Sequence, residues 1–206
     1  IFFIFCILVI INGNNFIDGT NGNMALSNVI QLISIALLAD NVGDGNVVAL
    51  VCLLLIPLVV FALFNFPFGK VFCGDTGAYF YGFAVSATII YLFGVYNEIL
   101  SWNAILILIY PSMELLFSFI RKKIFEKKSP FKADAKHLHS LIFRYLKNKN
   151  SALTNNSVVT IYLLPFIAPP PLLIYFYYDD INIIIFSIII LTILYFMAYN
   201  ILIRRL

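Results

Sequence analysis

The segment IIIFSIIILTILYFMAYNILI, at Ile183–Ile203, decides the fold class of this chain. It carries no charged residue and is rich in Ile and Leu throughout. A helix that crosses a bilayer needs roughly 20 mostly apolar residues, and this segment meets that requirement. We therefore expect Ile183–Ile203 to be a transmembrane helix.

The composition of the whole chain agrees with a membrane protein. Of its 206 residues, 62% are hydrophobic and 11% are charged, whereas soluble domains are about half apolar and about a quarter charged. This balance excludes a disordered chain, a secreted disulfide scaffold and a soluble nucleic-acid binder. The cysteines, Cys6, Cys52 and Cys73, are few and scattered, so we expect free thiols.

Further apolar segments predict a bundle of spans. The full-length candidates are Met24–Ala39, Val47–Phe64, Thr76–Tyr96, Trp102–Ile120, Val158–Tyr178 and Ile183–Ile203. Ile1–Ile11 is too short to span and resembles the second half of a helix, so we expect the chain to be the C-terminal portion of a longer protein. The predicted fold is an all-α, polytopic transmembrane bundle of about six full spans and one partial N-terminal span, forming a single domain over residues 1–206.

The distribution of charge predicts which loops face the cytoplasm. If the loops alternate sides, all 13 Lys and Arg residues fall on one side: Lys70, those between Arg121 and Lys149, and Arg204–Arg205. The charged residues on the other side are all acidic. The positive-inside rule makes the basic side cytoplasmic, with its largest loop at residues 121–157.

Three polar clusters gather on this predicted cytoplasmic side. The first is NGNNFIDGTNG at Asn12–Gly22, which we expect to be a turn region. Asn12, Asn15 and Asp18 follow one another at a spacing of three, so on a helix end they would project from nearly one side. Gly19 would permit close approach of a ligand to the backbone. The alternative is a polar turn with an asparagine cap.

The second cluster is FNFPFGKVFCGDTG at Phe64–Gly77. Asp75 could be a Mg²⁺ ligand, because Mg²⁺ is bound by one or two carboxylates together with substrate phosphates and waters. Lys70 would supply a charge for phosphate. The alternative is that Asp75 only caps the following helix.

The third cluster, Ser129–Arg144, contains His137, His139 and Arg144. Two histidines at this spacing do not form a helical zinc pair, so binding of a phosphate or sugar is the more natural role. The alternative is a basic loop on anionic headgroups. Glu114, within a span, is expected to pair with Arg121.

Together the clusters resemble the polyprenyl-phosphate N-acetylhexosamine-1-phosphate transferases of glycosyltransferase family 4. The matching patterns are N-x-x-N-F-I-D-G-x-N-G at Asn12–Gly22, F-N-x-P-x-x-K-V-F-x-G-D-T-G at Phe64–Gly77 and H-L-H-S-L-I-x-R at His137–Arg144. The family's aspartate-rich motif, D-D-x-x-D, is absent, which agrees with a missing N-terminal part. Asn21 stands where many members have Asp, and Ser140 where many have a third His.

The resemblance implies transfer of an N-acetylhexosamine-1-phosphate from a UDP-sugar to undecaprenyl phosphate, with release of UMP. The reaction would occur at the cytoplasmic face of the bacterial inner membrane, for lipopolysaccharide or other cell-envelope polysaccharides. Mg²⁺, or Mn²⁺ in its place, would be held by Asp75, with Asp18 as the second catalytic carboxylate. The implied substrate-binding residues are Asn12, Asn15, Asn21, Lys70, His137, His139 and Arg144.

The implied partners are the nucleotide sugar, the lipid phosphate and the bilayer, with a homodimer as a possible assembly and no nucleic acid. A chain without the aspartate-rich loop is expected to be inactive by itself. Two alternatives remain. A transporter or scaffold would use Glu114 and the proline-broken helices, and an intramembrane aspartyl protease would use Asp18 and Asp75 as a dyad.

Overall fold

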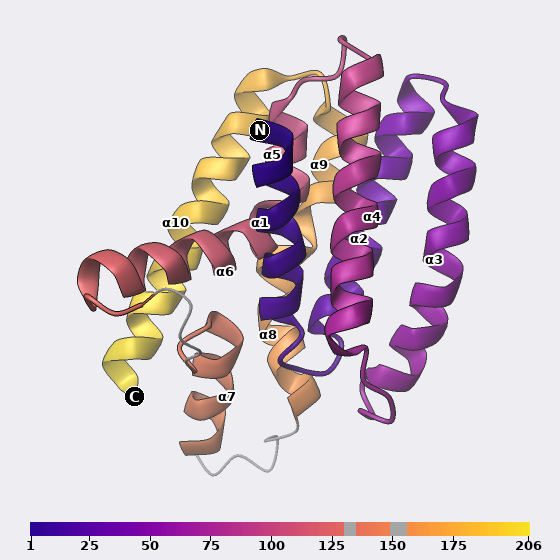
Figure 1. Ribbon diagram of the computed structural model, residues 1–206. Coiled ribbons are helices and arrows are strands. Elements are labelled where there is room, and N and C mark those ends of the chain that lie inside the picture. The colour runs from indigo at the N-terminus through magenta and orange to yellow at the C-terminus, as the bar shows by residue number, and fades with distance from the viewer. Residues whose placement is uncertain (130–134, 149–155) are drawn as a thin grey trace.

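The protein is a bundle of helices, and its computed structural model describes residues 1–129, 135–148 and 156–206 (Figure 1). No strand occurs in those ranges. Residues 130–134 of the third cluster and 149–155 of the predicted large loop lie outside the described residues. The elements are α1 (Phe2–Ile17), α2 (Asn23–Asn41), α3 (Gly45–Asn65), α4 (Gly74–Val95), α5 (Trp102–Ile107), α6 (Ile109–Ile120), the π-helix η1 (Arg121–Phe125), α7 (Leu138–Asn148), α8 (Asn156–Ile167), α9 (Pro169–Tyr177) and α10 (Ile181–Arg205).

Among the described residues, five helical segments are long and apolar enough to cross a membrane: α2, α3, α4, α8 together with α9, and α10. Many large apolar side chains on α3 and α10 are exposed, among them Leu53, Leu63, Phe186 and Met197. An apolar surface of this kind is unfavourable in water and favourable against lipid. Helices suit a lipid environment because they satisfy their own backbone hydrogen bonds. The predicted all-α, multi-pass membrane fold is confirmed.

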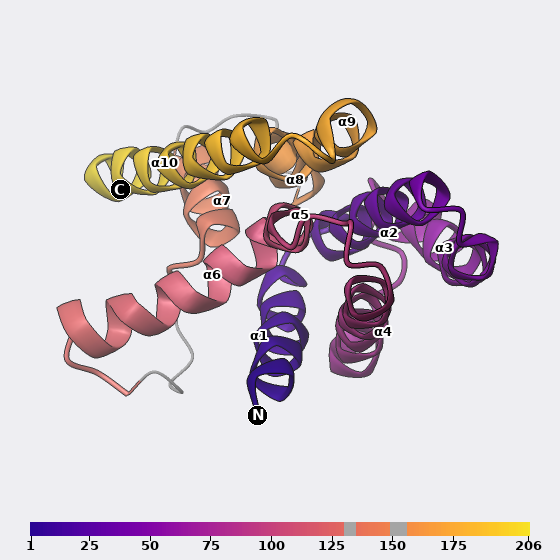
Figure 2. The same ribbon diagram turned by 90° about the horizontal axis from the view of Figure 1, so that it is seen from above.

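The segment predicted as one span at Trp102–Ile120 is broken into two helices. α5 ends at Ile107 and α6 begins at Ile109, with Leu108 between them. Pro111 explains the break, because a proline ring clashes with the carbonyl four residues before it and provides no N–H. Seen from above, α6 leaves the bundle obliquely (Figure 2). The predicted span at Trp102–Ile120 is therefore interrupted at Leu108, close before Pro111.

The first helix is longer than the sequence suggested. α1 continues to Ile17, so Asn12–Asn15 are helical and only the residues after Ile17 form the turn. Two glycines let this helix lie close to its neighbours. A Cβ at Gly13 would lie 2.5 Å from the carbonyl oxygen of Pro111 on α6, and one at Gly82 on α4 would lie 2.8 Å from the Cα of Ile11. The end of α1 is thereby held between α4 and α6.

The loops lie at two ends of the bundle, as alternation predicts. The α1–α2 turn, the α3–α4 loop and α7 lie at one end, and the α2–α3 turn and the α9–α10 connection lie at the other (Figure 1). The amphipathic helix α7 packs on α8 and α10 through a buried apolar cluster that includes Leu138, Leu141 and Leu163. The described residues of the three polar clusters therefore share one end of the bundle with the basic residues of the α3–α4 loop and α7.

Candidate active site

The C-terminal end of α1 meets the first turn of α4. Asn15 Nδ2 donates a hydrogen bond to Asp75 Oδ1 across 2.9 Å. Asp18 ends α1 as its C-cap residue, and Asp75 lies in the first turn of α4, where the helix dipole favours a negative charge. The first and second sequence clusters therefore come together at one place.

Asp18 and Asp75 also interact electrostatically. Partial burial raises the pKa of Asp18 to about 6, and the nearby charge of Asp75 contributes to the rise. Two carboxylates that repel each other are stabilised by a cation between or beside them. The pair is therefore suited to a metal ion.

The histidine helix reaches the same turn. A Cβ on Gly19, the residue after Asp18, would collide with Nε2 of His139. The rings of His137 and His139 stack with their centroids 5.6 Å apart and their planes 2° from parallel. His137 also contacts the edge of Phe16 at 4.8 Å between centroids. The third cluster thus reaches the α1–α2 turn, directly after Asp18.

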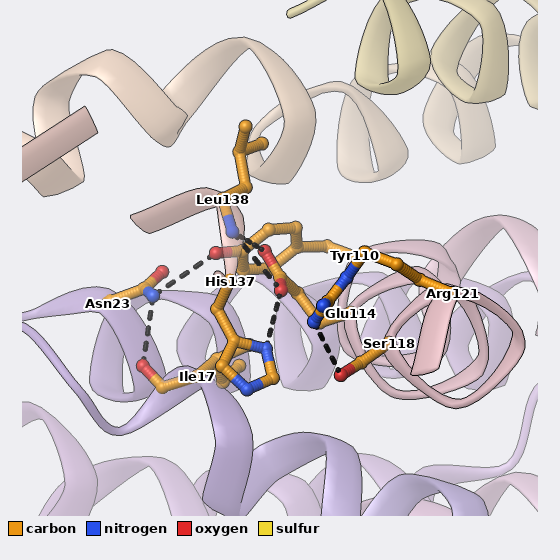
Figure 3. A network of polar contacts seen from close by, with 8 residues as sticks. All are labelled: Ile17, Asn23, Tyr110, Glu114, Ser118, Arg121, His137 and Leu138. Atoms are coloured by element: carbon orange, nitrogen blue, oxygen red, sulfur yellow. Dashed lines mark hydrogen bonds and ion pairs between the residues drawn. The ribbon is translucent and has the colours of Figure 1, made fainter. Parts of the chain in front are cut away.

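Glu114 does not take the partner expected for it. Its carboxylate is 1% exposed and accepts hydrogen bonds from the backbone N–H of Leu138, at 3.2 Å, while Oε2 lies 3.2 Å from Nδ1 of His137 (Figure 3). Arg121 pairs instead with Glu126, at 2.7 Å. The predicted Glu114–Arg121 bridge is wrong, because the oblique α6 carries Glu114 under the start of α7, and the π-helical turn carries Arg121 toward Glu126.

His139 is almost completely buried. Burial lowers its pKa to about 4; Glu114 opposes this effect and His137 adds to it. Its Nδ1 has no hydrogen-bond partner among the residues that the structure describes. His139 is therefore a neutral imidazole at pH 7 with one polar nitrogen left for a ligand.

The other predicted site residues lie around this centre. Asn12 donates to the carbonyl of Leu8 in its own helix at 2.7 Å. Asn21 is buried and donates to Ser157 Oγ at 3.2 Å. Lys70 is exposed, with Nζ 5.1 Å from the ring centroid of Phe68, and Arg144 is exposed on α7. These contacts of Asn12, Asn21 and Lys70 are with groups other than Asp18, Asp75 and the two histidines, and the substrate-binding roles of all four residues stay predictions.

Comparison with known proteins identifies the family. Residues 1–93 match Glycosyl transferase family 4. The chain belongs to this family. It is 32% identical over 165 residues, 78% of its length, to the "Probable undecaprenyl-phosphate N-acetylglucosaminyl 1-phosphate transferase" of Bacillus subtilis (strain 168), covering 44% of that protein. It is 30% identical over 145 residues, 70% of its length, to the "Undecaprenyl-phosphate alpha-N-acetylglucosaminyl 1-phosphate transferase" of Thermotoga maritima, covering 43%.

These matches confirm the resemblance drawn from the three clusters. The chain spans less than half the length of the two curated relatives. No solved structure matches it.

Two buried residues near the site were missed by the sequence reasoning. Lys122, at the start of η1, is 3% exposed and lies with Nζ 6.0 Å from the ring centroid of Phe16. Asn14 is fully buried and exchanges hydrogen bonds with Asn28 on α2, at 2.9 and 3.1 Å. The signal that could have indicated Lys122 was its position directly after the apolar segment that ends at Ile120, where a basic side chain lies at the end of a helix. The sequence does not show which face of α1 is buried, so it could not distinguish the buried Asn14 from Asn12 and Asn15.

The donor set at this site fits Mg²⁺ better than zinc. In residues 1–129, 135–148 and 156–206, no three His, Cys, Asp or Glu residues form a group that could hold a metal ion. Structural zinc sites need about four such protein ligands. Mg²⁺ keeps waters and shares its remaining ligands with phosphates, so Asp75, with Asp18 nearby, fits a site completed by a substrate.

Proposed function

We propose that the protein transfers an N-acetylhexosamine-1-phosphate from a UDP-sugar to undecaprenyl phosphate at the cytoplasmic face of the membrane. The observation that carries this proposal is that Asp18 lies near Asp75, while His139, stacked on His137, packs against the turn that follows Asp18, at the basic end of a membrane bundle. A site at the end of the bundle can receive a water-soluble nucleotide and a lipid with its tail in the bilayer. The names of the two curated relatives support the lipid acceptor.

In this reaction, an oxygen of the lipid phosphate attacks the β-phosphorus of the UDP-sugar. The bond between that phosphorus and the UMP oxygen breaks, and UMP leaves with the electron pair. Mg²⁺ held by Asp75, or Mn²⁺ in its place, would supply positive charge against the crowded phosphate oxygens. Asn15 holds the carboxylate of Asp75 in one orientation through its 2.9 Å hydrogen bond.

Asp18 is the second carboxylate of the proposed site. Because its pKa is raised to about 6, it can accept a proton from the attacking phosphate near neutral pH. His139, neutral and buried, can hydrogen-bond to the sugar or diphosphate without adding charge. Lys122 and the exposed Lys70 and Arg144 would supply positive charge for the phosphates.

The experiment is a UMP-release assay on the protein expressed from its complete gene, in liposomes with undecaprenyl phosphate and UDP-N-acetylglucosamine or another UDP-N-acetylhexosamine. We expect UMP release that requires Mg²⁺ and falls at least about 1000-fold in Asp75→Asn, because the metal ligand is lost. Asp180→Asn is the matched control: Asp180 caps α10 at the other end of the bundle, and Asn also caps helices. Full UMP release by Asp75→Asn, or none by the wild type with any UDP-N-acetylhexosamine, would contradict the proposal.

A further inference from the structure

Glu114 is a buried carboxylate that none of the proposed chemical steps uses. It lies on α6 and is 1% exposed. A charged group in this position is costly unless hydrogen-bond donors compensate for the lost water. Two groups face it at the start of α7: the N–H of Leu138, which donates to it, and the ring of His137, the residue before the helix. Both belong to the start of the histidine helix, so the carboxylate is tied to the site through that helix.

The contact with Leu138 fixes the backbone. Leu138 is the first residue of α7, and its N–H lies 3.2 Å from Oε1 and 3.4 Å from Oε2 of Glu114. The first N–H groups of a helix have no partner inside the helix and carry a partial positive charge. Glu114, which lies on α6, therefore holds the N-terminus of α7 in place. This contact also fixes the positions of His137 and His139 at the start of that helix.

The contact with His137 fixes the ring. Glu114 Oε2 lies 3.2 Å from Nδ1, and an ionised carboxylate only accepts hydrogen bonds. With the carboxylate as the acceptor of this contact, the proton of the neutral ring lies on Nδ1, and the second ring nitrogen points away from Glu114 (Figure 3). The edge of Phe16 on one side and the parallel ring of His139 on the other hold the imidazole in this orientation.

We propose that Glu114 is a positioning residue for the transfer: it keeps the proton of His137 on Nδ1 and holds the imidazole in its orientation beside His139. This inference rests on the proposed function for the identity of the substrate, but the position of the proton does not depend on it. Glu114 itself touches no reacting atom and acts through His137.

Nitrogen-15 NMR of histidine-labelled protein tests the position of the proton directly. The protein is expressed from its complete gene, and the His137 signals are those missing from His137→Asn. In the wild type at about pH 8, we expect a protonated Nδ1 and an unprotonated Nε2. In Glu114→Gln the side-chain amide can donate to Nδ1, so the proton moves to Nε2. A wild-type ring protonated on Nε2 and bare at Nδ1 overturns the proposal, whatever the activity of the protein.

Kinetics test the consequence for the reaction. We expect Glu114→Gln to lower kcat roughly 100-fold, as for loss of a correctly protonated group, and to leave the KM for the UDP-sugar within about twofold. Glu114→Asp, which keeps a carboxylate, should recover part of kcat. His137→Asn combined with Glu114→Gln should lose little beyond His137→Asn alone, because both act through one ring. Unchanged kcat in Glu114→Gln, or losses that multiply in the double variant, overturn the proposal. A wild type without UMP release would instead contradict the proposed function, and the NMR result still decides the role of Glu114.

Discussion

Asn15 on α1 holds Asp75 on α4 through a 2.9 Å hydrogen bond that joins two sequence motifs 60 residues apart. The amide donates to one carboxylate oxygen, Oδ1. Oδ2 does not take part in this bond. The same turn places Asp18 close enough for its pKa to respond to the charge of Asp75. This one contact ties the first motif of the sequence to the proposed metal ligand.

Removing the amide should weaken metal binding. In Asn15→Ala the carboxylate of Asp75 loses its fixed orientation, and loss of such an outer partner typically costs about 10- to 100-fold in metal affinity or activity. We expect the Mg²⁺ concentration for half-maximal UMP release to rise by roughly 10-fold or more. Asn182→Ala, at an exposed position on α10, is the control. An unchanged Mg²⁺ dependence in Asn15→Ala would show that the hydrogen bond does not matter for the metal.

A methyl group at Gly19 should displace the histidine helix. The Cβ of Gly19→Ala would collide with Nε2 of His139, which is buried and stacked on His137. The rings of His137 and His139 must then shift. We expect UMP release to fall at least about 10-fold, because catalysis tolerates little misplacement of the groups at the site. Gly94→Ala is the matched control, since a Cβ there meets nothing within 4 Å. Equal activity of the two variants would contradict the close packing of Gly19 against His139.

Protonation of His139 should destabilise the folded protein in mild acid. Its pKa is about 4 in the fold and about 6.5 when unfolded. Between these values the unfolded chain binds more protons, so this group makes stability rise with pH. Between pH 7.5 and pH 5, it should lower the free energy of unfolding by about 2 kcal/mol. Thermal unfolding in detergent at both pH values should show a smaller acid shift for His139→Gln than for the wild type. An equal shift would mean that His139 is not held neutral by burial.

The buried pair Asn14 and Asn28 should matter for stability. Both side chains are fully buried and each donates to the other. Asn28→Ala leaves the Asn14 carboxamide oxygen without this donor, which costs about 1–3 kcal/mol. Asn14→Ala together with Asn28→Ala should cost less than the sum of the single changes. Chemical denaturation of the single and double variants measures this coupling, and strictly additive losses would exclude it.

Much of the fold could be predicted from the sequence because its signal is local. A run of apolar residues such as Ile183–Ile203 can form a helix that satisfies its own backbone hydrogen bonds. Such a helix can be predicted from its own sequence, without knowledge of the helices that pack on it. The charge distribution then assigned each loop to a side. The boundaries were less certain: Asn12–Asn15 look like turn residues, yet they continue α1 because helices α4 and α6 pack around them.

The candidate site was predictable in its residue types and less so in its contacts. Asp18, Asp75 and the histidines were chosen from their motifs, and the structure places Asp18 near Asp75 and packs His139 against the turn after Asp18. The partner of Glu114 was predicted incorrectly, because helical spacing points to Arg121. The deciding factor was the break at Leu108, which redirects α6 and places the carboxylate under Leu138. Such a tertiary contact depends on the path of a whole helix and has no local signal.

The most direct test of the shared site uses Mn²⁺, a paramagnetic ion that binds the same oxygen ligands as Mg²⁺. Mn²⁺ is added to histidine-labelled protein expressed from its complete gene, and the ring signals of His137 and His139 are followed by NMR. If Asp75 holds the ion beside the two histidines, both signals broaden at low Mn²⁺, excess Mg²⁺ restores them, and Asp75→Asn prevents the effect. Sharp His137 and His139 signals in the wild type with Mn²⁺ bound would contradict a single site formed by the three clusters.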